Sequence, residues 1–205
     1  MQTVAIDLIQ KLKNKGINTF FGVQGGACAR LIEAVVKTGG SFYPVLNEQA
    51  AGYCAHGYFL ATRKPAGIIM TTGPGFTNAV SGIAACYYDN IPLIVLVGQV
   101  KKSINVASKF GTKMVGFQEL PHLKIGKSIA DDTYCIDSEK KYKSFLNNFI
   151  GNYKEKVSII EVLDNVQRIN VKPKIKNKKF KAKNEKNINK NIFKRLNKKR
   201  ITFLL

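Results

Sequence analysis

Glu48 is an isolated acidic residue, and its carboxyl group is a candidate for a catalytic or ligand-binding role. It is the only Asp or Glu in residues 44–78, where its neighbours are mostly Ala, Gly, Tyr and Leu. It follows an apolar segment and begins another with helical periodicity. A carboxylate at the start of a helix can simply be stabilised by the helix dipole. It can also handle a proton at the edge of a sheet, and both interpretations stay open here.

Small and polar residues follow four of the five segments that we predict to be strands. They are residues 22–27, Asn47-Glu48, Gly73-Pro74-Gly75 and Gly98-Gln99. Glycines let a backbone approach a ligand closely, and the first turn of a helix offers free N–H groups. In an open parallel sheet, ligands bind beyond the carboxyl ends of the strands. We therefore expect Glu48 to face the same crevice as the Gly-Pro-Gly turn and Asn78.

The common nucleotide-binding motifs do not occur in this sequence. The segment GPGFTN has Asn78 where the third small residue of a dinucleotide fingerprint belongs, and no GxxxxGK[ST] is present. The four cysteines are widely separated without a CxxC pair, and neither His56 nor His122 adds metal-ligand spacing. We predict no metal site in this chain, and free thiols in a reducing compartment.

Strand-like and helical segments alternate along most of the chain. Helices are predicted at 3–14, 27–38, 48–62, 76–88 and 139–151, and strands at 17–23, 41–46, 66–72, 91–99 and 157–163. Residues 100–128 are interpreted as a long loop with a helical turn. This order predicts an α/β domain over residues 1–171, with an open parallel sheet of about five or six strands flanked by helices.

The positive charge is concentrated at the end of the chain. Of the formal net charge of +20, residues 1–171 hold +7 and residues 172–205 hold +13. Residues 172–190 have the composition of a Lys/Asn-rich linker. Such a basic tail could bind nucleic acid by releasing counterions, but its aromatic residues are too scattered for a base-stacking surface. We therefore do not expect a nucleic-acid partner. No signal peptide or membrane span is evident, which predicts a cytoplasmic protein without membrane association.

Several of these segments together resemble one enzyme family. They are FGVQGGA, NEQAAGYCAHGYFLATRKPAGIIMTTGPGFTNAVSGIAACYYDNIPLIVLVGQV, GFQE and VSIIEVLDNVQ. In this order and spacing they resemble the pyrimidine-binding domain of thiamine-diphosphate-dependent enzymes, and most of all acetolactate synthase large subunits. The resemblance implies thiamine diphosphate as cofactor and FAD as a further one. It also implies decarboxylation or carboligation of a small 2-keto acid such as pyruvate, by a transferase of branched-chain amino acid biosynthesis.

The resemblance also implies roles for single residues. Glu48 matches the catalytic glutamate that hydrogen-bonds the aminopyrimidine ring of the cofactor and so promotes loss of the thiazolium proton. The matching cofactor-binding residues are Gly25, Glu48, Pro74, Gly75 and Asn78. On the substrate side, the matching residues are Gly26, Ala27, Phe117 and Gln118. His56 stands where an acidic residue is common in the family, and we interpret it as a helix-surface or interface side chain.

Family members place their diphosphate and Mg²⁺ ligands in another domain, which opens with Gly-Asp-Gly. That tripeptide does not occur here, and residues 191–205 resemble the first helix and strand of a middle domain. We therefore expect a truncated chain that is inactive by itself. The alternative is the pyrimidine-domain subunit of a split thiamine-diphosphate decarboxylase. The expected partner is a second copy, or a separate chain that bears the diphosphate-binding domain.

Overall fold

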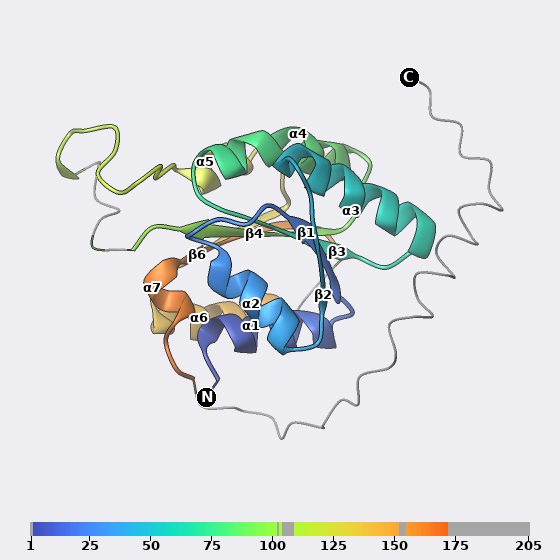
Figure 1. Ribbon diagram of the computed structural model, residues 1–205, viewed down its shortest axis with the longest axis horizontal. Coiled ribbons are helices and arrows are strands. Elements are labelled where there is room, and N and C mark those ends of the chain that lie inside the picture. Colours follow the sequence, from blue (N-terminus) through green and yellow to red (C-terminus); the bar gives the residue numbers. More distant parts are fainter. Residues whose placement is uncertain (1, 102, 104–108, 152–154, 172–205) are drawn as a thin grey trace. The chain divides into compact units, whose positions relative to one another are not determined.

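Strands and helices alternate along the chain in the computed structural model, which describes residues 2–101, 103, 109–151 and 155–171 (Figure 1). The strands are β1 (Thr19–Gly22), β2 (Ser41–Pro44), β3 (Ala66–Met70), β4 (Leu93–Gln99), β5 (Asp132–Ile136) and β6 (Val157–Leu163). The helices are α1 (Val4–Asn14), α2 (Ala29–Lys37), α3 (Glu48–Thr62), α4 (Pro74–Tyr88), α5 (His122–Gly126), α6 (Glu139–Phe145) and α7 (Asp164–Gln167). A π-helical turn, Leu146–Ile150, continues α6.

The six strands form one sheet in the order β2-β1-β3-β4-β6-β5, and every neighbouring pair is parallel. Every residue of β3, β4 and β6 is buried. Such complete burial is expected for strands covered on both faces by crossover helices. The chain turns back twice within the sheet: after β2, which leaves β1 beside β3, and after β5, which places β6 between β4 and β5. The predicted open parallel sheet is confirmed.

Two helical layers enclose the sheet (Figure 1). Ile94 and Leu96 of β4 pack into a core with α1, α2 and α6, because alternate side chains of a strand point to opposite faces. Leu93, Val95 and Val97 pack into a second core with α3 and α4. Both cores are apolar, and the burial of this surface is the main stabilising contribution to the domain.

Local signals set the ends of the two helices nearest the predicted site. The Asn47 side chain accepts a hydrogen bond from the Gln49 N–H at 2.8 Å. This bond caps the start of α3. Pro74 occupies the first position of α4, where its missing N–H costs no hydrogen bond. α3 ends at Arg63, which adopts the left-handed conformation with φ 58°. That conformation is common where helices end.

α3 and α4 approach so closely that glycine is required at their crossing. A Cβ atom added to Gly52 would lie 2.5 Å from the Gly82 Cα, and one added to Gly82 would lie 2.7 Å from the Gln49 carbonyl oxygen. This contact brings the first turn of α3, which carries Glu48, beside the first turns of α4.

The sequence interpretation missed one strand and misplaced several boundaries. β5 escaped detection because it lies at the edge of the sheet and four of its five residues are only half-buried, without a clear alternation. α4 begins at Pro74 rather than at residue 76, and β2 ends at Pro44 rather than at residue 46. The linker and stub expected at 172–190 and 191–205 lie outside the described residues. Within the described part of the chain, no helix is both long enough and apolar enough to cross a membrane.

Candidate functional site

The first reversal of strand order places the ends of β1 and β3 side by side. Ligands bind at such switch points in open α/β sheets, because the loops diverge there and leave a crevice. The loop after β1 contains Gly25, and the loop after β3 contains Thr71 and Gly73 and leads into Pro74 and Gly75 at the start of α4. The structure brings these loops into contact.

Glu48 lies at this crevice, at the start of α3. Its side chain is largely buried, and the residue is 8% exposed. The Asn78 Nδ2 atom donates to Glu48 Oε2 at 3.1 Å from the facing helix α4. Among the described residues this is the one side-chain hydrogen bond that the carboxylate accepts. Because a buried carboxylate normally has several donors, Glu48 retains capacity for a ligand.

Thr71 lies against both Gly25 and Gly75. A residue with a side chain at either glycine position would collide with it. A Cβ added to Gly25 would lie 2.6 Å from Thr71 Cβ, and one added to Gly75 would lie 2.9 Å from Thr71 Cγ2. The same Gly75 Cβ would lie 3.4 Å from Glu48 Oε1. Gly25, Thr71, Gly75, Glu48 and Asn78 are therefore contiguous. Sequence reasoning overlooked Thr71, although it stands just before the Gly-Pro-Gly turn.

The turn between β3 and α4 depends on glycine at its first position. Gly73 has φ 67° and ψ −120°. Residues with a side chain rarely adopt this conformation. A Cβ there would also lie 2.5 Å from the Gln118 carbonyl oxygen. The Gln118 backbone thus packs against the turn that leads to Pro74, which joins one predicted substrate-side residue to the predicted cofactor-binding loop.

The other predicted substrate-side residues lie in different surroundings. Phe117 is exposed, with 74% of its surface accessible, and a Cβ added to Gly26 would meet no atom within 4 Å. Ala27 is held by the Gln167 Nε2 atom, which donates to its carbonyl oxygen at 2.7 Å. The Ala27 carbonyl also packs directly on Gly98. None of the described contacts of these three residues joins them to Glu48.

A second group of buried polar residues lies at the neighbouring strand ends. It comprises Thr72, Gln99, His122 and Glu161, each less than a tenth exposed. Sequence analysis placed Gln99 at a strand end but missed the others. Glu161 carried a usable signal, since it is the only charged residue in the otherwise apolar segment 157–163.

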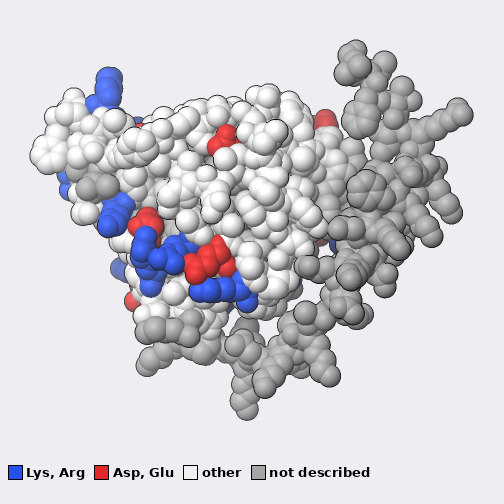
Figure 2. Space-filling view, in the orientation of Figure 1, with Lys and Arg blue, Asp and Glu red and all other residues white. Residues whose placement is uncertain are grey.

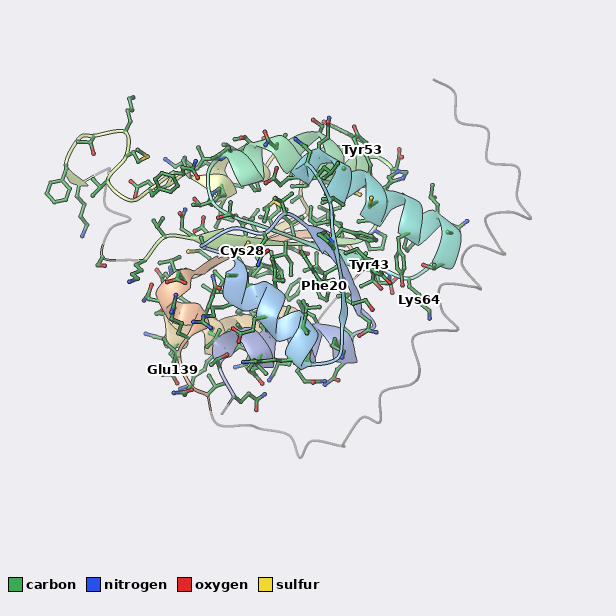
Figure 3. All side chains as sticks on the ribbon, in the orientation of Figure 1. Phe20, Cys28, Tyr43, Tyr53, Lys64 and Glu139 are labelled. Carbon is green, nitrogen blue, oxygen red and sulfur yellow. The ribbon has the colours of Figure 1, made fainter. Side chains whose placement is uncertain are left out.

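Of the remaining histidine and the thiols, Cys28 contacts the crevice directly, because its Sγ atom donates to the Gly25 carbonyl oxygen at 3.4 Å. His56 on α3 is half-buried and pairs with Asp89, with His56 Nε2 2.6 Å from Asp89 Oδ2. Cys28, at the start of α2 (Figure 3), is buried, and burial raises the pKa of its thiol to about 11. In the parts of the chain that the structure describes, no three His, Cys, Asp or Glu side chains gather as a metal site would require.

Comparison with known proteins identifies the class to which this fold and crevice belong. Residues 2–123 match the family described as thiamine pyrophosphate enzyme, N-terminal TPP binding domain. Because the match covers more than half of the chain, this chain belongs to that family. The match includes β1 to β4 and all the residues that line the Glu48 crevice.

The similar curated proteins include acetolactate synthases from bacteria and plants. The acetolactate synthase large subunit of Buchnera aphidicola (subsp. Schizaphis graminum) is 43% identical over 130 residues, which cover 63% of this chain and 22% of that protein. The acetolactate synthase isozyme 3 large subunit of Escherichia coli K12 is 40% identical over 133 residues, which cover 63% of this chain and 21% of that protein. The chloroplastic acetolactate synthase of Arabidopsis thaliana is 34% identical over 134 residues, which cover 63% of this chain and 18% of that protein. The matched region therefore spans about a fifth of the length of these relatives.

Proposed function

We propose that this domain holds the aminopyrimidine half of thiamine diphosphate at the ends of β1 and β3, as part of an acetolactate synthase-like enzyme. The enzyme would decarboxylate a small 2-keto acid such as pyruvate and transfer the resulting two-carbon unit to a second 2-keto acid. The contact between Glu48 and Asn78, in a crevice lined by glycines, is the observation that carries the proposal. Membership of the thiamine pyrophosphate enzyme family supports it.

The side chains of the crevice match an aminopyrimidine ring in chemistry. Gly25 and Gly75 carry no side chain, and Thr71 packs where their Cβ atoms would lie. A flat ring would therefore meet Thr71 together with the backbone of these two glycines. Glu48 supplies a carboxylate and Asn78 an amide, which match the mixed donors and acceptors at the edge of such a ring. When bound, thiamine diphosphate supplies the carbanion chemistry.

Glu48 would perform the proton transfer that this domain contributes. Its carboxyl group would share a proton with a ring nitrogen, which requires it to be held in one orientation. Asn78 fixes that orientation by donating to Oε2, and Oε1 faces Gly75. Partial burial limits the access of water to the same atoms. Pro74 and Gly75 would set the approach of the first turn of α4 to the ring.

The diphosphate and Mg²⁺ would be held by residues other than those of this domain. The described residues offer no cluster of metal-ligating side chains, and the crevice carries no Lys or Arg in contact with Glu48 or Asn78 among the interactions that the structure describes. FAD is proposed as a further cofactor from the acetolactate synthase resemblance, without assignment to any residue here.

A protein partner would cover the outer side of α3. This helix carries apolar residues around its whole circumference, and Tyr53 and Leu60 are about half exposed. Such a helix is usually buried. Figure 2 shows few charges over α3 and α4, and Figure 3 shows Tyr53 on this outer layer. A second copy, or a chain bearing the diphosphate-binding domain, would meet this surface, and a split decarboxylase is the alternative assembly. Four free cysteines support a cytoplasmic location.

A titration by nuclear magnetic resonance tests the proposed ring site directly. Adding thiamine diphosphate to the ¹⁵N-labelled chain should shift the side-chain amide of Asn78 and the backbone amides of Gly25 and Gly75. Glu48→Gln should weaken these shifts, whereas Glu33→Gln, an exposed and ion-paired carboxylate on α2, should leave them unchanged. Shifts confined to surface lysines would overturn the site.

Complementation tests the reaction. The chain alone should bind the cofactor weakly and turn over no pyruvate. Adding the remaining part of the Escherichia coli isozyme 3 large subunit should restore turnover if the two parts assemble into one active site. Tight binding of thiamine diphosphate by this chain alone, measured by calorimetry, would contradict the assignment of the diphosphate to other residues.

A further inference from the structure

The buried polar group beside the Glu48 crevice links four separate elements. Thr72 follows β3, Gln99 ends β4, His122 begins α5 and Glu161 lies within β6. His122 is completely buried, and Gln99 is 1% exposed. A polar cluster in this position is costly to desolvate, and apolar residues of the same volume would usually be at least as stable. Stability alone therefore does not explain this polar cluster, and we looked for a functional role.

The hydrogen bonds of His122 determine where its proton resides. The Gly73 N–H donates to Nε2 at 3.2 Å. That nitrogen must therefore be unprotonated, since only a bare ring nitrogen accepts. Nδ1 lies 2.6 Å from Glu161 Oε2, so it carries the proton and donates it to the carboxylate. Gln99 Nε2 also donates to Glu161 Oε2, at 3.2 Å. The imidazole is therefore neutral, with its proton on Nδ1.

Steric contact holds the imidazole in this orientation. The Phe76 ring packs on it, with the ring centroids 5.1 Å apart. The Thr72 hydroxyl completes the enclosure: it lies 2.9 Å from Gln99 Oε1, 3.0 Å from the Gln118 carbonyl oxygen and 3.2 Å from His122 Nε2. A rotation of the imidazole would break its hydrogen bonds with Gly73 and Glu161 and its contacts with Thr72 and Phe76. Glu161 and the Cys135 thiol, which lies 3.5 Å from Glu161 Oε1, are the titratable groups on this side.

Gly73 connects this cluster to the proposed cofactor site. Its backbone, in a conformation that favours glycine, begins the turn that places Pro74 and Gly75, and α4 then carries Asn78 to Glu48. An acceptor placed at the Gly73 N–H fixes the peptide plane at the start of that turn. A protonated Nε2 would instead oppose one N–H with another.

We propose that His122 is a positioning residue: as a neutral imidazole held by Glu161, it accepts the Gly73 N–H and thereby fixes the turn that presents Pro74, Gly75 and Asn78. The consequence for catalysis rests on the proposed function. The placement of the turn does not, and it can be measured without cofactor.

The first test is spectroscopic. The chain contains two histidines, so ¹⁵N-histidine labelling gives two sets of imidazole signals, and His56→Asn assigns them. We expect the His122 signals of a neutral ring with Nδ1 protonated and Nε2 bare. A ring protonated on Nε2, whether neutral or charged, would overturn the proposal. This measurement uses the unaltered fold of the full chain.

The second test compares two substitutions of the same residue. His122→Leu removes the acceptor, and hydrogen exchange of the Gly73 amide should accelerate on the order of tenfold, the effect of one buried N–H left without a partner. His122→Gln offers an amide oxygen near the position of Nε2 and should recover most of the protection. Equal exchange in the wild type and in His122→Leu would overturn the proposal, as would a Gln variant no better than Leu.

The third test separates this proposal from the proposed function. In the complemented enzyme, His122→Leu should lower kcat about tenfold, by the same loss of one hydrogen bond, and His122→Gln should restore it. If the imidazole signals and the Gly73 exchange behave as expected but thiamine diphosphate has no effect on any variant, the turn assignment stands and the proposed function is wrong. Unchanged kcat in an active His122→Leu enzyme would overturn the catalytic consequence.

Discussion

The two buried glutamates of this domain, Glu48 and Glu161, lie at the carboxyl side of the same sheet in different chemical surroundings. Within the described structure, Glu48 accepts a side-chain hydrogen bond from Asn78. Glu161 is contacted by His122, Gln99 and Cys135. The two residues are almost equally exposed, at 8% and 7%. Burial alone therefore does not distinguish them.

The difference in partners shows how a carboxylate can serve structure or chemistry. A carboxylate has about four lone-pair positions, and those without a protein donor must find water or a ligand. Glu161 is paired by the fold and orients an imidazole. Glu48 keeps open positions at a switch point lined by glycines. Loss of Glu161 should therefore lower the free energy of unfolding, and loss of Glu48 should lower the rate of the reaction.

The largest expected effect is the loss of turnover in Glu48→Gln. The amide can still accept from Asn78 but cannot share a proton, and removal of a general acid–base group lowers rates by about 10²- to 10⁴-fold. Pyruvate consumption by the complemented enzyme measures this. The unfolding midpoint in urea should stay near the wild-type value, which separates chemistry from folding. Retention of full activity would remove Glu48 from the mechanism.

The reverse pattern is expected for Glu161→Leu. This change leaves the His122 Nδ1–H and the Gln99 amide buried without their acceptor, at a cost of about 1–3 kcal/mol in the free energy of unfolding. Urea unfolding of the full chain measures it. The matched variant Glu48→Leu should cost less, because one hydrogen bond is lost and a poorly paired carboxylate is removed. If Glu48→Leu proved the more destabilising, the contrast between the two carboxylates would be wrong.

A smaller effect should follow from adding one methyl group to the crevice. In Gly75→Ala the new Cβ would lie 2.9 Å from Thr71 Cγ2, so the crevice must shift. Ala nevertheless favours the helix by about 1 kcal/mol. We expect cofactor binding in the complemented enzyme to weaken about tenfold while the free energy of unfolding stays unchanged or rises. Thr71→Ser removes Cγ2, and in the double variant it should restore binding. If the double variant does not recover binding, the clash with Thr71 is not the cause of the weaker binding.

The smallest effect concerns the thiols beside the two carboxylates. Burial, and after it the charge of Glu161, raises the pKa of Cys135 to about 12, while burial raises the pKa of Cys28 to about 11 with Glu48 the weakest contributor. A raised pKa means that little thiolate exists near neutral pH, so alkylation should increase only as the pH approaches these values. Glu161→Gln should lower the pKa of Cys135 and speed its alkylation a few-fold. Glu48→Gln should alter Cys28 less. Mass spectrometry of the alkylated peptides, with the exposed Cys54 as reference, measures both. A larger response at Cys28 would contradict this order.

The regular elements near the Glu48 crevice could be predicted because their signals are local. The predicted helix 48–62 agrees with α3, which has Asn47 as a side-chain cap. The predicted strands 66–72 and 91–99 contain β3 and β4, whose residues are all buried. Since strand ends of a parallel sheet share one edge, the loops that carry Glu48 and the Gly-Pro-Gly turn could be assigned to one crevice from spacing alone. Edge strand β5 has neither a continuous apolar run nor an alternating one, and it was missed.

The sequence by itself therefore determined the strand–helix order as far as residue 99, the resemblance to the family and the choice of Glu48, because each depends on residue types within one segment or on spacing along the chain. Tertiary structure alone decided which side chains become partners. Thr71 lies against Gly25 and Gly75 because the sheet order reverses between β1 and β3. His122 meets Glu161, far along the chain, because α5 packs against β6. Hydrogen bonds between such distant positions leave no periodic signal in a sequence, since they arise from the packing of elements and not from the conformation of any one of them.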